Sequence, residues 1–409
     1  MVVKMDFEKF KIKESSAYSL FDDKGDLYYL MNKDKKVLKF NSKYSVIEGY
    51  KVIEIYDHSL LPFSCKHYIN YFSTWLSDRP IPTNQEHLHN VLNSLQMDSR
   101  KVIDLLKVNH GFSLNDSYWI CPVEENDFNV KMSWEDNNLY SNEFDEAIGL
   151  ITFFGNESSL GGTVRTPEIT NQGSVGKAWR RVNNKLILYK KTSEGASNLG
   201  KEHYAEALAS KVLDIIGLDH VDYWLDSWHG KECSCCEIFT DENVGYLTMY
   251  QYLNGLGINI NNWDYMTVLS SIENEVDKQL FNDMIVFDFI IENWDRHFAN
   301  FGFLVNNDTQ EVLKFAPIFD NGYSLMCRDL ESDFINRDYL NYSKVNTFKL
   351  VTNKDIASFI IKNNPNRYKS WSKKIMTNLD RLLVEGCPNW YFSGVVDLII
   401  SRCKLIQSF

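Results

Sequence analysis

The sequence contains few cysteines, eight in 409 residues, and only Cys233, Cys235 and Cys236 lie close together. This density is too low for a disulfide-stapled secreted domain and favours a reducing, cytoplasmic compartment. A structural zinc site needs four ligands with paired spacing, and the cluster, even with His229 nearby, has no second Cys-x-x-Cys arm. We therefore interpret the cysteine cluster as a partly buried surface turn.

Long apolar segments and basic blocks are also missing. The longest apolar stretch, residues 284–291, is interrupted by Asp288 and is far shorter than the ~20 residues of a membrane helix. Residues 1–16 carry charges throughout, unlike a secretory signal. Lys and Arg total 43 against 55 Asp and Glu, a net charge of -12 that argues against nucleic acid as a partner. These absences predict a cytoplasmic protein that binds neither membrane nor nucleic acid directly.

The composition is that of a folded chain, with 44% hydrophobic and 24% charged residues. Short apolar runs between turn signals predict antiparallel strands within residues 18–55, and mixed helical periodicity follows over 61–108. The β-branched and aromatic run 148–154 predicts a strand. With the glycine-containing segment 155–176 and the strand-like run 185–191, it predicts a strand, loop and strand unit.

The second half of the chain is predominantly helical in pattern. Apolar residues at helical spacing over 198–216, with Gly217 placed to end them, predict a helix. Further elements are predicted in chain order: strands at 221–225 and 244–253, then helices over 263–292 and 354–405. No internal repeat or low-complexity segment is present in the sequence.

The most specific motif is NWDRHFANFGFL at residues 293–304, followed by APIFDNG at 316–322. Phosphoryl transfer needs one carboxylate that orients the attacking hydroxyl, and an Asn and a second carboxylate that hold Mg²⁺ on the phosphates. Asp295, Asn300 and Asp320 have the residue types and the order for these three roles.

The apolar residues around the motif support the same interpretation. Residues 301–305 and 312–318 are typical of two short strands, whose hairpin would bring Asn300 and the 320–322 turn to one end. The alternative is a buried hydrogen-bonded pair of Asp295 and His297 beside an ordinary Asp-Asn-Gly turn. The combined spacing favours catalysis.

These residues resemble the HipA-like kinases, whose catalytic segment reads Asp-x-His-x-x-Asn and is followed by a metal-binding Asp. The resemblance covers residues 55–350 and includes four further segments: LLPF at 60–63, SLNDSYW at 113–119, GSVGKAW at 173–179 and EALAS at 206–210. It implies an α+β, two-lobed protein-kinase-like fold that uses ATP and Mg²⁺ to phosphorylate Ser or Thr of proteins.

The same resemblance implies three structural units. Residues 1–110 would form an N-terminal β-rich and helical subdomain, and residues 111–253 the kinase N-lobe with the glycine-containing loop, the strand lysine and the helix glutamate. Residues 254–409 would form the helical C-lobe with the catalytic and metal-binding loops.

A kinase also needs a phosphate-positioning lysine at a strand end, paired with a glutamate on the next helix. Lys190 and Lys191 are the two candidates, and because both faces of the strand are apolar, alternation does not decide between them. We favour Lys190, which directly ends the apolar run. Glu206 fits the family pattern Glu-x-x-Ala-Ser, and Glu202 one turn earlier is the alternative. Taken singly, each of these four residues fits ordinary solvated surface charge as well as it fits a role in the site.

The segment before the strand lysine departs from the usual pattern, because it has no Gly-x-Gly-x-x-Gly. The loop 172–177 contains only Gly173 and Gly176. In the HipA-like family a serine of this loop can be autophosphorylated, which makes Ser174 the candidate and Lys177 a candidate phosphate contact. The alternative is a plain hairpin turn.

The adenine is expected against a hinge at residues 250–253, directly after a strand over 246–250. Tyr250 and Tyr252 lie there, and core packing is the competing interpretation of both rings. His297 joins the candidate nucleotide-binding residues through its place in the motif.

The sequence thus predicts an ATP- and Mg²⁺-dependent protein serine/threonine kinase that autophosphorylates. A lipid or small-molecule kinase, an AMP transferase on the same fold, and a pseudokinase or toxin that acts by binding a partner are the alternatives. HipA-like kinases are often toxins restrained by a small DNA-binding antitoxin. The resemblance therefore implies a protein substrate and an antitoxin-like regulatory protein as partners, although the chain shows no helix-turn-helix segment of its own.

Overall fold

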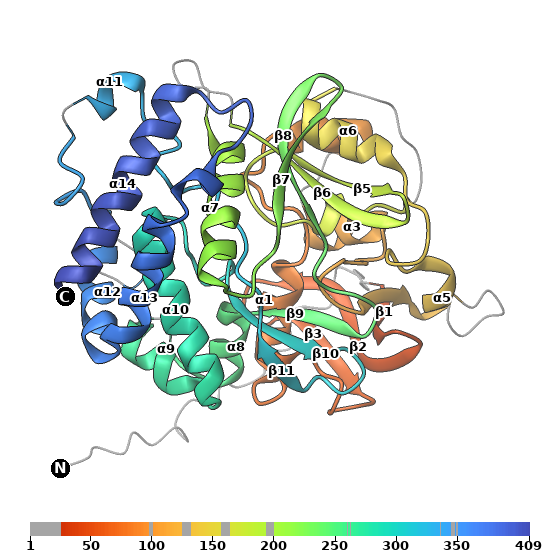
Figure 1. Ribbon diagram of the computed structural model, residues 1–409. Coiled ribbons are helices and arrows are strands. Elements are labelled where there is room, and N and C mark those ends of the chain that lie inside the picture. The colour runs from red at the N-terminus through yellow and green to blue at the C-terminus, as the bar shows by residue number, and fades with distance from the viewer. Residues whose placement is uncertain are drawn as a thin grey trace, which may run out of the picture.

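The computed structural model describes residues 26–97, 101–124, 132–156, 164–193, 200–259, 261, 263–335, 337–344, 348 and 351–409. The sheets and short helices of the first half lie together on one side of the molecule, and the helices of the second half gather on the other (Figure 1). Of the sequence predictions, those on residues 1–16, on 18–25 of the strand region and on 157–163 of the glycine-containing segment lie outside the described residues.

The first sheet has the strand order β3-β2-β1-β4 and is antiparallel throughout. Its strands are β1 (Leu27–Asn32), β2 (Lys35–Ser45), β3 (Gly49–Ile55) and β4 (Tyr118–Pro122). The helices between β3 and β4 are short: α1 (Phe72–Ser77), α2 (Leu88–Ser94) and α3 (Val102–Val108). Leu30, Phe40 and Phe72 are fully buried in the core that the sheet shares with α1 and α3. The predicted strands within 18–55 and the helical pattern over 61–108 are confirmed for the described residues.

The second sheet carries the lysine candidates. Its order is β5-β6-β8-β7, formed by β5 (Lys177–Val182), β6 (Lys185–Lys191), β7 (Tyr223–Trp228) and β8 (Lys231–Glu237). Asn183 and Asn184, both at positive φ, make the tight turn between β5 and β6. The predicted helix over 198–216 is confirmed as α7 (Glu202–Ile216), and Gly217 ends it at φ +79°.

The strand predicted at 148–154 is wrong, because these residues lie in helix α6 (Glu146–Phe154). The Asp145 side chain caps the helix by accepting from the Ala147 N–H at 2.8 Å, and Gly155 ends it at φ +75°. Phe153 packs against the second sheet, while Ile148 and Ile151 face α2 and α3. A short apolar run that is buried on several sides lacks the alternation that separates a strand from a helix.

The cysteine cluster is not a surface turn, and that prediction is wrong as well. Cys233, Cys235 and Cys236 lie in β8, which is hydrogen-bonded to β6 on one side and β7 on the other. All three are buried, and the turn lies just before them, at His229 and Gly230. Successive side chains of a strand point to opposite faces, so the burial of both Cys235 and Cys236 shows that the sheet is covered on both faces here, an environment that suits small apolar thiols.

The remaining sheet, β11-β10-β9, joins the sheet-rich half to the helices. It consists of β9 (Val244–Thr248), β10 (Gly302–Asn306) and β11 (Val312–Phe315), so the predicted hairpin is confirmed. The helices are α5 (Trp134–Asn137) in the first half, and α8 (Met249–Gly255), α9 (Tyr265–Ser271), α10 (Glu275–Ile291), α11 (Glu331–Phe334), α12 (Asn353–Asn363), α13 (Pro365–Met376) and α14 (Asn389–Ser408) in the second. The predicted helical regions 263–292 and 354–405 are thereby confirmed.

Helix α10 is the central helix of this half and is buried along most of its length, with α12 and α14 against it. Its burial explains the apolar run 284–291 that the sequence shows. In the part of the chain that the structure describes, we find no helix whose length and apolarity would let it span a bilayer.

Candidate active site

The ammonium group of Lys190, near the end of β6, lies between two carboxylates. Its Nζ forms an ion pair with Oε1 of Glu206 and lies 2.5 Å from Oδ1 of Asp320. Glu206 comes from α7 with only 1% of its side chain exposed, and Asp320 comes from the loop that follows β11. Strand β6, helix α7 and the much later Asp320 loop therefore meet at one nitrogen atom.

Strand alternation separates the two lysine candidates. Lys191 Nζ points to the other side of the sheet, where it pairs with Oε1 of Glu86 at 2.9 Å and lies 3.3 Å from Nε2 of His87. Lys190 is the lysine that faces α7.

The two glutamate candidates are separated in the same way. Glu206 uses its second oxygen, Oε2, to accept the backbone N–H of Asn321 at 2.8 Å, so it contacts both the strand lysine and the Asp-Asn-Gly loop. Glu202 instead accepts the Ser193 hydroxyl and pairs with Nε of Arg328 at 2.5 Å. The pair that the structure forms is therefore Lys190 with Glu206.

The electrostatic environment keeps Asp320 ionised. Burial alone would raise the pKa of Asp320, but the ammonium groups of Lys190 and Lys177 outweigh burial and hold this pKa well below its ordinary value. Burial would likewise lower the pKa of Lys190, but Asp320 and Glu206 reverse the effect and raise it above its ordinary value. Both members of the pair are charged at neutral pH.

The catalytic motif forms the loop between α10 and β10. The Asn293 side chain donates to Oδ1 of Asp288 at 3.1 Å and accepts the Asp295 N–H at 2.9 Å. The Asn300 amide nitrogen donates to the Asp295 carbonyl at 3.2 Å, so its Oδ1 is the atom left to bind a cation. Burial raises the pKa of Asp295, and the charge on Asp320 acts in the same direction while His297 opposes it. The carboxyl groups of Asp295 and Asp320 thus lie close enough to influence each other.

Arg296 joins the catalytic loop to the Asp320 loop, and its side chain is almost fully buried. Its Nε and Nη2 each donate to the Asp288 carboxylate at 3.0 Å. Its Nη1 donates to the carbonyls of Asn300 at 3.1 Å and Phe319 at 2.6 Å, and Nη2 donates to Oδ1 of Asn321 at 2.5 Å. One guanidinium group therefore holds the backbone of Asn300 and the two residues that flank Asp320.

Sequence reasoning did not assign a role to Arg296. The signals were present, because an arginine stands inside the motif and Asp288 is the charge that interrupts the apolar run 284–291. A charge inside a buried helix requires a partner, and the sequence does not show which cation supplies it.

The loop before β5 lies beside this site. Ser174 is exposed, and its carbonyl accepts the Glu86 N–H at 2.9 Å. Lys177 starts β5 and donates to the Gln172 carbonyl. Burial lowers the pKa of Lys177 to about 8, and Asp320 opposes this shift. Lys177 and Asp320 each shift the pKa of the other, so the beginning of β5 lies near one candidate metal ligand.

The predicted hinge is the part of the site that the structure corrects. Strand β9 ends at Thr248, whose hydroxyl accepts the Gln251 N–H at 3.1 Å and caps α8, so residues 250–253 are helical rather than extended. Tyr252 stacks on Phe63 with ring centroids 5.3 Å apart and is buried in the core. The Tyr250 N–H donates to a carbonyl of the catalytic loop. The Tyr250 ring packs edge-to-face on Trp263, with centroids 5.4 Å apart, so the contacts of both rings agree with the packing interpretation.

His297 is exposed on the catalytic loop, and its Nδ1 accepts the Ala299 N–H at 3.3 Å. The alternative of a buried Asp295–His297 pair therefore does not describe this loop.

Comparison with known proteins also indicates similarity to kinases. No family model matches the chain. The serine/threonine-protein kinase CtkA of Helicobacter pylori is 30% identical over 131 residues, which make up 30% of this chain and 40% of that protein. The match thus spans less than half of the curated relative.

Two solved structures are similar to this chain in fold. The crystal structure of the H. pylori proinflammatory kinase CtkA covers 59% of this chain and 94% of its own, with 19% identity and a TM-score of 0.48. HipA of the Shewanella oneidensis toxin–antitoxin system, solved with HipB and operator DNA, covers 93% of this chain and 99% of its own, with 11% identity and a TM-score of 0.50.

The HipA structure extends over nearly the whole chain, so the predicted two-lobed, kinase-like α+β fold is confirmed. The resemblance to the HipA-like kinases is confirmed with it, in sequence by a curated kinase and in fold by HipA.

Proposed function

We propose that the chain is an ATP- and Mg²⁺-dependent protein serine/threonine kinase. The observation that carries the proposal is the ion pair of Lys190 with Glu206 and Asp320, beside a loop that holds Asp295 and Asn300. This combination supplies each role that phosphoryl transfer needs: phosphate positioning, metal binding and orientation of the attacking hydroxyl.

The residues fit Mg²⁺, which prefers oxygen ligands. Asp320 is ionised, and 34% of its side chain is exposed, so a cation can reach it. Asn300 offers its amide oxygen, because its nitrogen donates to Asp295. Held by Asp320 and Asn300, the ion would supply positive charge that offsets the negative charge developing on the transferred phosphate.

Lys190 would bind the nucleotide phosphates with the same ammonium group that pairs with Asp320 in the structure. Glu206 holds that group in position from the buried side. Asp295 would accept a hydrogen bond from the substrate hydroxyl and take its proton as the oxygen–phosphorus bond forms and the bond from the γ-phosphorus to ADP breaks. A pKa raised by burial makes Asp295 a better proton acceptor than an ordinary aspartate.

A protein as the substrate is supported by the curated relative, which is named a serine/threonine-protein kinase. Ser174 supports autophosphorylation, since its loop is exposed and adjoins Lys177 at the edge of the site. We extend the proposal to an antitoxin-like regulatory partner, because the HipA structure of the same fold was solved with HipB.

The test is incubation with γ-labelled ATP and Mg²⁺, followed by analysis of the protein and of small molecules. Wild type should become labelled, Asp295→Asn should not, and both should show a thermal shift with nucleotide. The matched control is Asp308→Asn. Asp308 lies in the β10–β11 turn, where its exposed carboxylate pairs with Lys33, and this variant should label like wild type. Ser174→Ala locates the autophosphorylation site.

Equal labelling of wild type and Asp295→Asn would refute the assigned role. A labelled small molecule in place of labelled protein would move the activity to a small-molecule kinase. In a parallel incubation with α-labelled ATP, label on the protein would show AMP transfer.

A further inference from the structure

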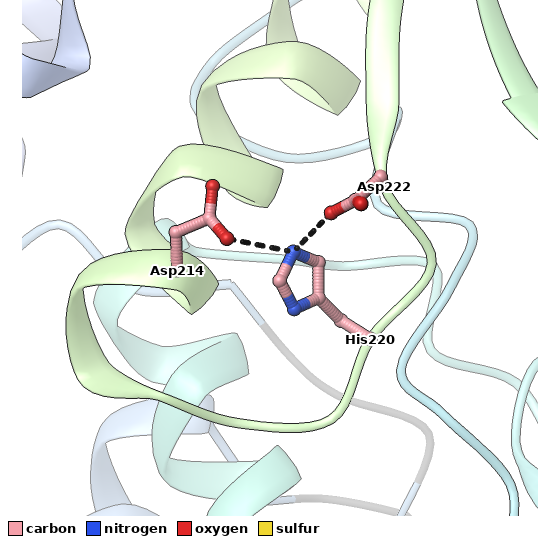
Figure 2. A group of neighbouring side chains, drawn as sticks. All are labelled: Asp214, His220 and Asp222. Atoms are coloured by element: carbon pink, nitrogen blue, oxygen red, sulfur yellow. Dashed lines mark ion pairs between the residues drawn. The ribbon is translucent and has the colours of Figure 1, made fainter.

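A histidine and two aspartates converge where α7 ends and β7 begins (Figure 2). Asp214 lies in the last turn of α7, and His220 and Asp222 lie in the connection from Gly217 to β7. One ligand atom from each residue, an imidazole nitrogen and two carboxylate oxygens, lies within 4.8 Å of the others. None of the three belongs to the kinase site described above.

The imidazole of His220 has one ring nitrogen satisfied and one not. Its Nδ1 donates to the Leu218 carbonyl at 2.8 Å, which fixes the orientation of the ring. Only 7% of the side chain is exposed, and Nε2 is buried without a hydrogen-bond partner. Figure 2 shows that this nitrogen points at both carboxylates, with 3.2 Å to Oδ1 of Asp222 and 3.7 Å to Oδ1 of Asp214.

These distances suit a shared cation better than a direct ion pair. Charge-assisted N–H···O bonds are about 2.7–2.9 Å long, shorter than either contact. In a tetrahedral site with metal–ligand bonds of about 2.0–2.2 Å, neighbouring ligand atoms lie about 3.3–3.6 Å apart. The two observed separations lie on either side of that range. The carbonyl behind Nδ1 is also the partner that metal-binding histidines commonly have.

We propose that Asp214, His220 and Asp222 bind one divalent transition-metal ion of the Zn²⁺ class. Nε2 and one oxygen from each carboxylate are the protein ligands, and water completes the shell. The imidazole nitrogen favours such an ion over Mg²⁺ or Ca²⁺, which take oxygen ligands. The carboxylates are 52% and 82% exposed, so both the ion and water can reach them.

The location adds an electrostatic reason for a cation. The C-terminal end of a helix carries partial negative charge. Asp214, in the last turn of α7, is therefore repelled both by the helix end and by the carboxylate of Asp222. A bound divalent ion offsets all three sources of negative charge.

The same turn is hydrogen-bonded to the segment that carries Asp320. The Val221 N–H donates to the Ile318 carbonyl at 2.9 Å, and the Ile318 N–H donates to the Asp219 carbonyl at 3.0 Å. Two residues later, the Asp320 N–H donates to the Tyr223 hydroxyl at 3.2 Å. An ion that fixes the α7–β7 turn therefore stabilises the backbone on which Asp320 stands.

The test measures Zn²⁺ binding to chelator-treated protein by equilibrium dialysis and calorimetry. Asp320→Asn serves as the parent, because it removes the ionised carboxylate of the kinase site as a competing ligand. We expect one zinc ion per chain. His220→Ala should lower the affinity by more than about 100-fold, since even losing an outer-shell partner costs about 10–100-fold.

Asp219→Asn is the matched control, because it lies in the same turn but pairs with Lys314 at 3.0 Å, and it should bind zinc like the parent. The double variant Asp214→Asn and Asp222→Asn tests the site without altering the ring, in case His220→Ala does not fold. Co²⁺ in place of Zn²⁺ should give visible absorption bands that both site variants lose.

Zinc affinity unchanged in His220→Ala or in the double aspartate variant would overturn the proposal. A ring that is doubly protonated at neutral pH by nuclear magnetic resonance, with no change on adding Zn²⁺, would overturn it too, and would show an imidazolium shared by two carboxylates.

Discussion

The substitution Glu206→Gln separates the kinase interpretation from a purely structural one. It keeps the size and shape of a side chain that is almost fully buried, and removes only its charge and one acceptor. In the structure, Glu206 accepts from two donors, the Lys190 ammonium through Oε1 and the Asn321 N–H through Oε2.

The magnitude follows from this pairing. A glutamine side chain has one acceptor oxygen and one donor nitrogen, so one of the two donors must face another donor. Loss of a hydrogen bond to a charged group costs about 1.5–3 kcal/mol. At about 1.36 kcal/mol per factor of ten, kcat/KM should fall about 10- to 150-fold if the pair positions Lys190 for the phosphates.

Glu202→Gln is the matched control. Glu202 lies one turn earlier on the same helix, is buried to a similar degree and pairs with Arg328 rather than with the strand lysine. The assay is steady-state phosphoryl transfer with labelled ATP, with the melting temperature of each variant measured alongside. We expect Glu206→Gln to lose activity and Glu202→Gln to lose only stability. Wild-type kcat/KM in Glu206→Gln, or an equal loss in both variants, would refute the reasoning.

Three further predictions concern the framework of the site. Arg296→Met leaves the Asp288 charge buried without its partner and should lower the free energy of unfolding, measured in urea, by about 3–5 kcal/mol. Adding Asp288→Leu should recover part of this loss. A double variant whose loss equals the sum of the two single losses would contradict the pairing. Burial raises the pKa of Glu168 from 4.5 to about 7, so the folded chain keeps a proton that the unfolded chain loses across this window. Stability should therefore fall as pH rises from 4.5 to 7, by up to about 1.36 kcal/mol per pH unit, and Glu168→Gln should flatten the decline in melting temperature; an unchanged slope would exclude Glu168 as its source. In Gly302→Ala the added Cβ would lie 2.1 Å from the Leu247 carbonyl oxygen, so β9 and β10 must separate. We expect the free energy of unfolding to fall by about 1–3 kcal/mol. A wild-type melting temperature would show that the two strands move apart at no cost, against this expectation.

The proximity of the candidate catalytic residues could be predicted from the sequence because their arrangement is local. Asp295 and Asn300 lie on one loop, and a single short hairpin carries the chain on to Asp320. The spacing of apolar residues predicts that hairpin, and the residue types indicate the chemistry that we propose for it. The choice between Lys190 and Lys191 was different in kind. Alternation shows that they face opposite sides of β6, but only the position of α7 shows which side holds the glutamate.

Two of the errors, those at α6 and β8, have a common cause, which is burial on more than one side. The run that forms α6 and the cysteine strand β8 are both enclosed by other elements, so neither shows the one-sided apolar pattern on which assignment depends. The prediction that strand β9 extends to residue 253 is wrong for another reason. Thr248 and Gln251 form a capping box that starts α8, a local signal that the continuous apolar and aromatic pattern of 244–253 concealed.

The Arg296–Asp288 ion pair lies in the candidate site although removing its two charges from water is costly, and its hydrogen bonds explain why it is there. Two apolar residues of similar volume would stabilise the fold as well as a buried ion pair does. They could not donate to the carbonyls of Asn300 and Phe319, which are the groups that the guanidinium holds together. The pair is therefore best understood as a positioning device: Asp288 on the rigid helix α10 orients the guanidinium, and the guanidinium sets the separation of the two loops that carry the proposed metal ligands.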